Sequence, residues 1–107
     1  MSEPRLVLIT HPADGAETFA RSLVERRLAA CVNLLGCRSV YRWEGEVQAD
    51  DEVLLVAKTT AGRLDELERA VASDHPYDVP ELVAVAPAAV EPRYLAWMLG
   101  ETSGHGA

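Results

Sequence analysis

Hydrophobic and polar residues along this chain follow two periods, one typical of strands and one typical of helices. Apolar runs of strand length occur at four places, residues 5–10, 29–35, 53–58 and 82–86. Two of the segments between these runs carry apolar residues every three or four positions, as one face of an amphipathic helix does. The pattern therefore predicts four strands, with a helix after the first and another after the third.

The second and third strands are predicted to form an antiparallel hairpin. The end of the second strand alternates, which predicts one face that carries Tyr41, Trp43 and Val47. A polar turn at residues 48–51 separates this strand from the third. We expect a β-bulge at each glycine of the region, Gly36 and Gly45.

The first helix has an N-terminal signal and an apolar stripe. Asp14, followed three residues later by Glu17, is typical of an N-cap with a supporting acid. The stripe recurs at helical spacing and consists of Ala16, Phe19, Ala20, Leu23, Val24 and Leu28. This helix is therefore expected to pack one face on a sheet.

Two more helices are predicted in the second half of the chain. Thr59 or Thr60 is suited to cap a helix whose apolar stripe is Leu64, Leu67 and Val71. That helix must end at Asp74, because Pro76 disfavours helical backbone at the residue before it. A short amphipathic helix is expected to begin at Pro92.

The order β-α-β-β-α-β plus a terminal helix predicts an α+β fold of the ferredoxin-like type. Right-handed crossovers place both main helices on one face of a four-stranded antiparallel sheet, which leaves the other face bare. We expect one domain over residues 1–100 and a disordered tail over residues 101–107.

The length of the hairpin predicts a homo-oligomer. If mostly extended, residues 31–47 span on the order of 50 Å at about 3.3 Å per residue. A domain of about 100 residues has a radius of gyration of only roughly 13 Å. The hairpin must therefore bend or project, and a projecting apolar hairpin needs another subunit to cover it.

Composition narrows the classes of partner. The chain has 107 residues and a formal net charge of −7, which argues against nucleic acid and anionic membranes as partners. No apolar run has membrane-spanning length and the first residues lack the features of a signal peptide, so we expect a cytoplasmic protein. The two cysteines, Cys31 and Cys37, suit a reducing compartment and form no CxxC pair.

The sequence carries no motif of an enzyme. A nucleophile elbow, a Gly-rich phosphate loop and an HExxH helix are all lacking. His75 is a conceivable general base, but so is almost any histidine with a pKa near neutrality. We therefore predict a protein without catalytic residues.

Five motifs follow one another in an order that resembles the CutA family of divalent-cation tolerance proteins. They are LAACVN at 28–33, SVYRWEG at 39–45, LLVAKT at 54–59, HPYDVPEL at 75–82 and YLAW at 94–97. The resemblance implies a cytosolic homotrimer of ferredoxin-like subunits, similar to the PII signalling proteins. It also implies a role linked to copper or other divalent metals.

The chain departs from the family pattern at two places. The family has a Pro-Gly-Val-like bend in the second strand, whereas this chain reads LLGCR at 34–38, without the proline. Two family cysteines that are linked to copper would correspond to Ile9 and Ala70 here. Of the family cysteines, this chain therefore keeps only Cys31.

The connector at residues 75–82 supplies the first candidate site, a metal site. Thiolate and imidazole ligands select copper or zinc, which makes Cys31 and His75 candidates together with the carboxylate of Glu81. Weaker candidates are Cys37, His11 and Asp78, and His105 is expected to be a spectator. A Cu²⁺ or other divalent cation is the cofactor that these residues suggest.

The second candidate is a small-molecule pocket between subunits. The groups with binding chemistry at family-motif positions are Tyr41, Trp43, Lys58, His75, Tyr77, Glu81, Tyr94 and Trp97. Convergence of hairpin, connector and terminal helix would give an apolar cleft with a few directed polar groups. The alternative is that the aromatic residues only pack between subunits, which would make the protein a trimeric assembly module without a ligand.

Overall fold

The computed structural model describes residues 3–103 and confirms the predicted order of elements. The elements are β1 (Pro4–His11), α1 (Ala16–Glu25), β2 (Cys31–Trp43), β3 (Glu46–Thr60), a 3-10 turn (Ala61–Arg63), α2 (Leu64–Asp74), β4 (Val83–Val85) and α3 (Pro92–Glu101). The strands form one antiparallel sheet in the order β2-β3-β1-β4. This is the ferredoxin-like arrangement that the sequence predicts.

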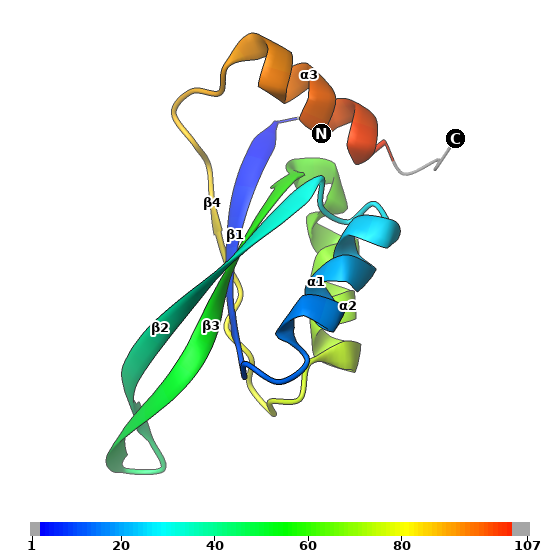
Figure 1. Cartoon of the computed structure of the whole chain (residues 1–107). Coiled ribbons are helices and arrows are strands. Elements are labelled where there is room, and N and C mark those ends of the chain that lie inside the picture. The colour runs from blue at the N-terminus through cyan, green and yellow to red at the C-terminus, as the bar shows by residue number, and fades with distance from the viewer. Residues whose placement is uncertain (1–2, 104–107) are drawn as a thin grey trace.

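The hydrophobic core lies between the sheet and the two main helices. Helices α1 and α2 cover the same face of the sheet, and α3 lies across one end of it (Figure 1). Side chains of β1 and β3 alternate, so that Val7, Ile9 and Leu55 are fully buried under the helices. Their partners in the core are Leu23 of α1 and Leu67 of α2. The predicted helical stripes therefore face the sheet, except that Val24 of α1 is 41% exposed, so its place in the stripe is wrong.

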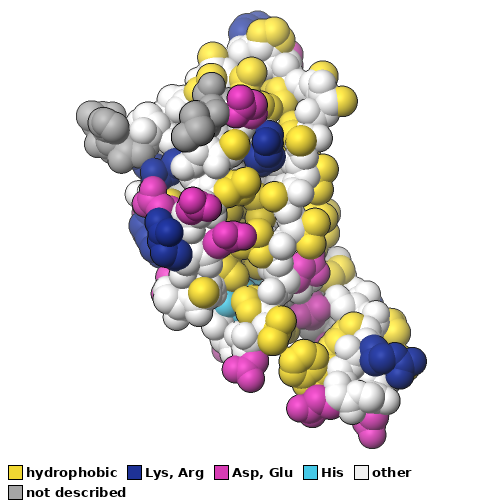
Figure 2. Space-filling model, turned by 180° about the vertical axis from the view of Figure 1, so that it is seen from behind, with side chains coloured by type: hydrophobic (Ala, Val, Ile, Leu, Met, Phe, Trp, Pro, Cys, Tyr) yellow, Lys and Arg dark blue, Asp and Glu magenta, His cyan; other side chains and the backbone are white. Residues whose placement is uncertain are grey.

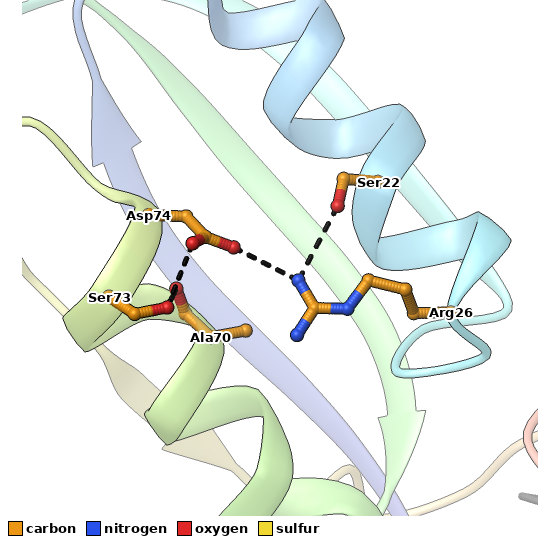
Figure 3. Close-up of polar contacts among 5 residues, drawn as sticks. All are labelled: Ser22, Arg26, Ala70, Ser73 and Asp74. Carbon is orange, nitrogen blue, oxygen red and sulfur yellow. Dashed lines mark hydrogen bonds and ion pairs between the residues drawn. The ribbon is translucent and has the colours of Figure 1, made fainter.

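An ion pair joins the two main helices at the surface. The Arg26 guanidinium donates to Asp74 at 2.9 Å and to the Ser22 hydroxyl at 3.5 Å (Figure 3). The Ser73 hydroxyl and the Arg26 guanidinium together lower the pKa of the Asp74 carboxyl. Both partners of the ion pair are about half exposed, so we expect it to contribute little to stability.

The hairpin turn lies closer to β2 than the sequence pattern indicates. Glu44 and Gly45 have φ angles of 49° and 82°, the left-handed backbone of a two-residue type I′ turn. Residues 48–51 belong to β3, so the polar turn predicted there is wrong. Pairing continues without a break past Gly36, which lies opposite Val53, and neither glycine forms a bulge.

The two-residue turn also changes which side chains share a face. Trp43 lies opposite Glu46, and Arg42 lies opposite Val47. Residues opposite one another in an antiparallel pair point to the same face. Val47 is therefore on the opposite face from Tyr41 and Trp43, and the prediction that the three share a face is wrong.

The helix caps differ in part from the prediction. Gly15, with φ 84°, occupies the N-cap of α1, and Asp14 makes no cap hydrogen bond. Thr60 precedes the 3-10 turn without a side-chain cap, whereas Thr59 is buried and donates to the Leu28 carbonyl at 2.7 Å. Helix α2 ends at Asp74 as predicted.

Helix α3 extends one residue into the predicted tail. It begins at Pro92 as expected, and the Glu91 carboxylate accepts hydrogen bonds from the first free N–H groups. It ends at Glu101, and the buried Thr102 hydroxyl donates to Met98. Ser103 is the last described residue. Residues 104–107 of the predicted tail, which include His105, lie outside the described residues.

The hairpin projects beyond the body of the domain, as the length argument predicts (Figure 1). The chain measures 44 × 27 × 21 Å with a radius of gyration of 14.3 Å. Within residues 3–103, no helix is long and apolar enough to cross a membrane. The molecule therefore presents a long ribbon whose end extends away from both main helices (Figure 1).

Candidate functional site

A groove separates the distal half of the hairpin from the connector. It has a volume of about 860 Å³, and we call it the connector groove. Its lining residues are Thr10, Ser39, Val40, Tyr41, Trp43, Glu52, Pro76, Tyr77, Asp78, Val79, Pro80 and Glu81. Four predicted ligand-binding residues therefore line one groove, namely Tyr41, Trp43, Tyr77 and Glu81.

A phenol from the connector binds a carboxylate of β3 at the wall of the groove. The Tyr77 hydroxyl donates to Glu52 Oε2 at 2.6 Å. Glu52 is only 8% exposed although it carries a carboxylate. Burial and the hydrogen bond to this carboxylate both raise the pKa of the Tyr77 phenol, so it remains a hydrogen-bond donor at neutral pH.

His75 fixes the connector to the end of β1. Its Nε2 lies 2.7 Å from the Thr10 carbonyl oxygen, and its Nδ1 accepts the Tyr77 N–H at 3.1 Å. This pairing requires the neutral ring with its proton on Nε2. Neither ring nitrogen is then free for a metal in this conformation.

A second buried histidine packs beside the first. The rings of His11 and His75 are 4.7 Å apart, and the Phe19 ring lies within 6 Å of both. Burial lowers the pKa of His75, and the neighbouring His11 lowers it further, against opposing effects of the Thr10 carbonyl and Glu52. The pair therefore acts as packing between β1, α1 and the connector.

The groove also brings carboxylates together. Burial raises the pKa of Glu81, and repulsion from the Glu52 carboxylate raises it further. On the exposed hairpin, the Tyr41 hydroxyl donates to Asp50, and this hydrogen bond raises the pKa of the phenol. Acidic and phenolic groups thus define the chemistry of this end of the molecule.

The other predicted ligand-binding residues form a separate cluster beside α3. The rings of Tyr94 and Trp97 are 5.4 Å apart, and Lys58 Nζ lies 5.8 Å from the centre of the Tyr94 ring. Lys58 is six residues from Glu52 along β3, which corresponds to roughly 20 Å. Within one chain, the eight predicted residues therefore do not form a single pocket.

The metal candidates are also far apart. Cys31 lies opposite Lys58, at the end of the sheet away from His75. Cys31 and Cys37 point to the same face, but six strand residues place them roughly 20 Å apart. No group of three His, Cys, Asp or Glu side chains in residues 3–103 is close enough to hold a metal ion. A metal site built on Cys31, His75 and Glu81 is therefore not assembled within one chain.

Glu52 is the residue of the groove that the sequence reasoning missed. The predicted turn at residues 48–51 placed Glu52 at the start of a strand, where an acidic residue is unremarkable. The signal was the pairing register, because a turn at Glu44 and Gly45 places Glu52 opposite Cys37 and two residues from Leu54 on the same face. A Gly preceded by a polar residue is a common hairpin turn.

Comparison with known proteins identifies the family. A family model described as CutA1 divalent ion tolerance protein matches residues 5–101. The divalent-cation tolerance protein CutA of Thermus thermophilus is 48% identical over 99 residues, which cover 91% of this chain and 96% of the relative. The chloroplastic protein CutA of Arabidopsis thaliana is 41% identical, and the matched region covers 91% of this chain but 54% of that longer protein.

Solved structures of similar proteins have the same fold. The Thermus thermophilus protein superposes with a TM-score of 0.89 at 48% identity, covering 92% of this chain and 98% of its own. The PII-like protein CutA from Nostoc superposes with a TM-score of 0.88 at 35% identity, covering 92% and 96%. Sequence and fold agree over nearly the whole chain, so the protein belongs to the CutA1 family of divalent ion tolerance proteins, with a PII-like fold.

Proposed function

We propose that the protein is a cytoplasmic, non-enzymatic homotrimer that supports divalent-cation tolerance. In this proposal, it binds a divalent cation such as Cu²⁺, or a small ligand, in clefts between subunits. The family membership supports the link to divalent cations. The resemblance to CutA and the shape of a single chain support the trimer.

The observation that carries the proposal is the open sheet face. We use this name for the face opposite α1 and α2, which includes Leu6, Leu8, Leu35, Leu54, Val56, Val83 and Val85. Leu35 is 50% exposed and Val83 is 49% exposed. Hydrophobic side chains reach the surface over the body of the molecule down to the hairpin (Figure 2). An apolar surface of this extent marks an interaction site.

Assembly would also complete the candidate sites. The connector groove and the Lys58 cluster lie at opposite ends of one sheet, so residues from a neighbouring copy can close each of them. Symmetric assembly of identical chains is the commonest way in which soluble proteins cover such faces. Ligand pockets form preferentially at boundaries of this kind.

Light scattering after size-exclusion chromatography tests the trimer. At micromolar concentration we expect three times the chain mass of 11.6 kDa. A stable monomer would overturn the proposal. Native mass spectrometry of protein purified without an affinity tag then reports any ligand retained by the assembly.

A trimeric assembly module without a ligand is the second candidate. It is favoured by the two occupied ring nitrogens of His75 and by the lack of a metal-binding cluster within residues 3–103. Calorimetric titration with Cu²⁺, Zn²⁺ and a panel of nucleotides separates the two candidates. Binding no tighter than millimolar for all of them favours the assembly module.

A further inference from the structure

We propose that the connector groove binds an organic ammonium cation with an apolar body. The inference rests on the proposed function, because it names the class of small ligand that the assembly takes. It is carried by the charge of the lining, by one buried carboxylate and by the aromatic side chains beside it.

All charged side chains of the lining are acidic. Among its twelve residues are three acids, Glu52, Asp78 and Glu81, and none is Lys or Arg. Within the described part of the chain, none of these three acids takes part in an ion pair, although six ion pairs occur elsewhere. The groove therefore attracts a cation and repels nucleotides and other anions.

The carboxylate of Glu52, a largely buried residue, can accept further hydrogen bonds. Glu52 as a whole residue is 8% exposed, and Tyr77 is the one side chain among residues 3–103 that donates to its carboxylate, at Oε2. A carboxylate accepts about four hydrogen bonds. The other oxygen has no donor from residues 3–103, and it is accessible from the groove, because no buried side-chain oxygen among these residues lacks a partner. An ammonium group provides both the charge and the missing donors.

The aromatic side chains of the lining favour an organic cation over a bare metal ion. Tyr41, Trp43 and Tyr77 line the same groove as the carboxylates, and Val40, Val79 and the two prolines add apolar surface. Aromatic faces attract ammonium groups, because the face of the ring carries partial negative charge. A divalent metal instead needs several oxygen, nitrogen or sulfur ligands at one point.

Repulsion between two carboxylates of the groove agrees with this assignment. The raised pKa of Glu81 shows that its charged form is disfavoured by burial and by Glu52. A bound cation between the two carboxylates would remove that repulsion. Removing the charge of Glu81 should therefore leave the fold intact and weaken the ligand, and these two effects can be measured separately.

The test uses the full-length chain with Trp97→Phe as its background. Trp43 is then the single tryptophan, because the chain contains two, and its fluorescence reports on the groove. The probes are 2-phenylethylamine, the neutral 2-phenylethanol and the anionic phenylacetate, which share a phenyl body and differ in charge. We expect the amine to bind about tenfold or more tightly than the alcohol, and phenylacetate not to bind.

Three charge variants test where the bound charge lies. Glu81→Gln should weaken the amine about fivefold or more while the melting temperature is kept or raised. Glu68→Gln changes the net charge equally on the exposed face of α2 and should leave the affinity unchanged. Glu52→Gln should also weaken binding, but Glu81→Gln carries the test if that variant fails to fold.

Three results would overturn the inference. Equal affinity for the amine and the alcohol would show an apolar pocket without charge selection. If the parent protein does not bind the amine and Glu81→Gln no longer forms the trimer, a neighbouring copy fills the groove. Binding of Zn²⁺ in the groove without the amine would show a metal site. In that last case the proposed function stands. If the parent protein is a monomer, the proposed function is refuted whether or not the amine binds.

Discussion

His75 is the residue through which pH should act on stability. The pKa of His75 is lowered in the folded protein from its ordinary value of 6.5, chiefly by burial. Above pH 6.5 both folded and unfolded chains are neutral there, and the stability contributed by the neutral ring is fully present. As the pH falls below 6.5, the unfolded chain takes up the proton first, so stability declines towards the lower, folded pKa.

We expect the His75→Gln variant to lose less stability than the parent protein when the pH falls below 6.5. Glutamine keeps a donor for the Thr10 carbonyl but does not titrate, and it loses the acceptor for the Tyr77 N–H. At pH 8 the variant should be less stable by about 1–2 kcal/mol. Urea denaturation at pH 8 and 5.5, at one protein concentration, measures both effects. A loss equal to that of the parent protein between the two pH values would contradict the role of His75.

Two tyrosine–carboxylate pairs allow a matched comparison of burial. Tyr77→Phe removes the one side-chain donor to the buried Glu52 among residues 3–103, so we expect a loss of about 1.5–3 kcal/mol of unfolding free energy. Tyr41→Phe removes a similar hydrogen bond to Asp50 on the exposed hairpin and should cost less than about 0.5 kcal/mol. Chemical denaturation of both variants gives the difference. Equal losses would show that burial does not decide the value of these bonds.

Several residues that line the groove could be picked out from the sequence because their chemistry is unusual for their position. A histidine, a phenol and a carboxylate in a proline-bounded connector indicate a binding site, and Tyr77 and Glu81 do line the groove. The local pattern could not show that both ring nitrogens of His75 form hydrogen bonds with backbone groups, since its partner Thr10 is 65 residues away in the sequence. The role of Glu52 depends on register in the same way.

The hairpin turn is the element whose geometry has a direct mutational test. Gly45 has φ 82°, where a Cβ is strained whatever the space around it. Gly45→Ala should therefore cost about 1 kcal/mol. Gly36→Ala is the control, because Gly36 lacks a positive φ and a Cβ there meets nothing within 4 Å. Its stability should stay the same or rise by about 0.5 kcal/mol. Thermal melts of both variants suffice, and equal losses would contradict the turn assignment.

Elements with a clear period were predicted more securely than their ends. The stripes of α1 and α2 identify both helices and the faces that they bury. The hairpin was harder, because acidic residues at 50–52 resemble a turn although they continue β3. Charged side chains are tolerated there because this part of the strand lies beyond the helices, where only the groove and solvent face it.

At the scale of the whole molecule, length and topology predicted more than the individual motifs. A 13-residue and a 15-residue strand cannot both stay within a body of this size, and the hairpin does project. The predicted binding residues were grouped as one site, however, and one chain places them at both ends of its sheet. In the proposed trimer, the arrangement of the copies decides whether the two clusters meet.

A charge on the open sheet face should therefore break the assembly. Leu35, 50% exposed, lies opposite Leu54 on that face, and Leu35→Glu would bury a carboxylate between copies without a partner. We expect this variant to run as a folded monomer in size-exclusion chromatography with light scattering, with its circular dichroism spectrum retained. Val24→Glu is the control, because Val24 is similarly exposed at 41% but belongs to α1. It should keep the mass of the parent protein. If Leu35→Glu keeps that mass as well, the open sheet face is not the surface through which the copies associate.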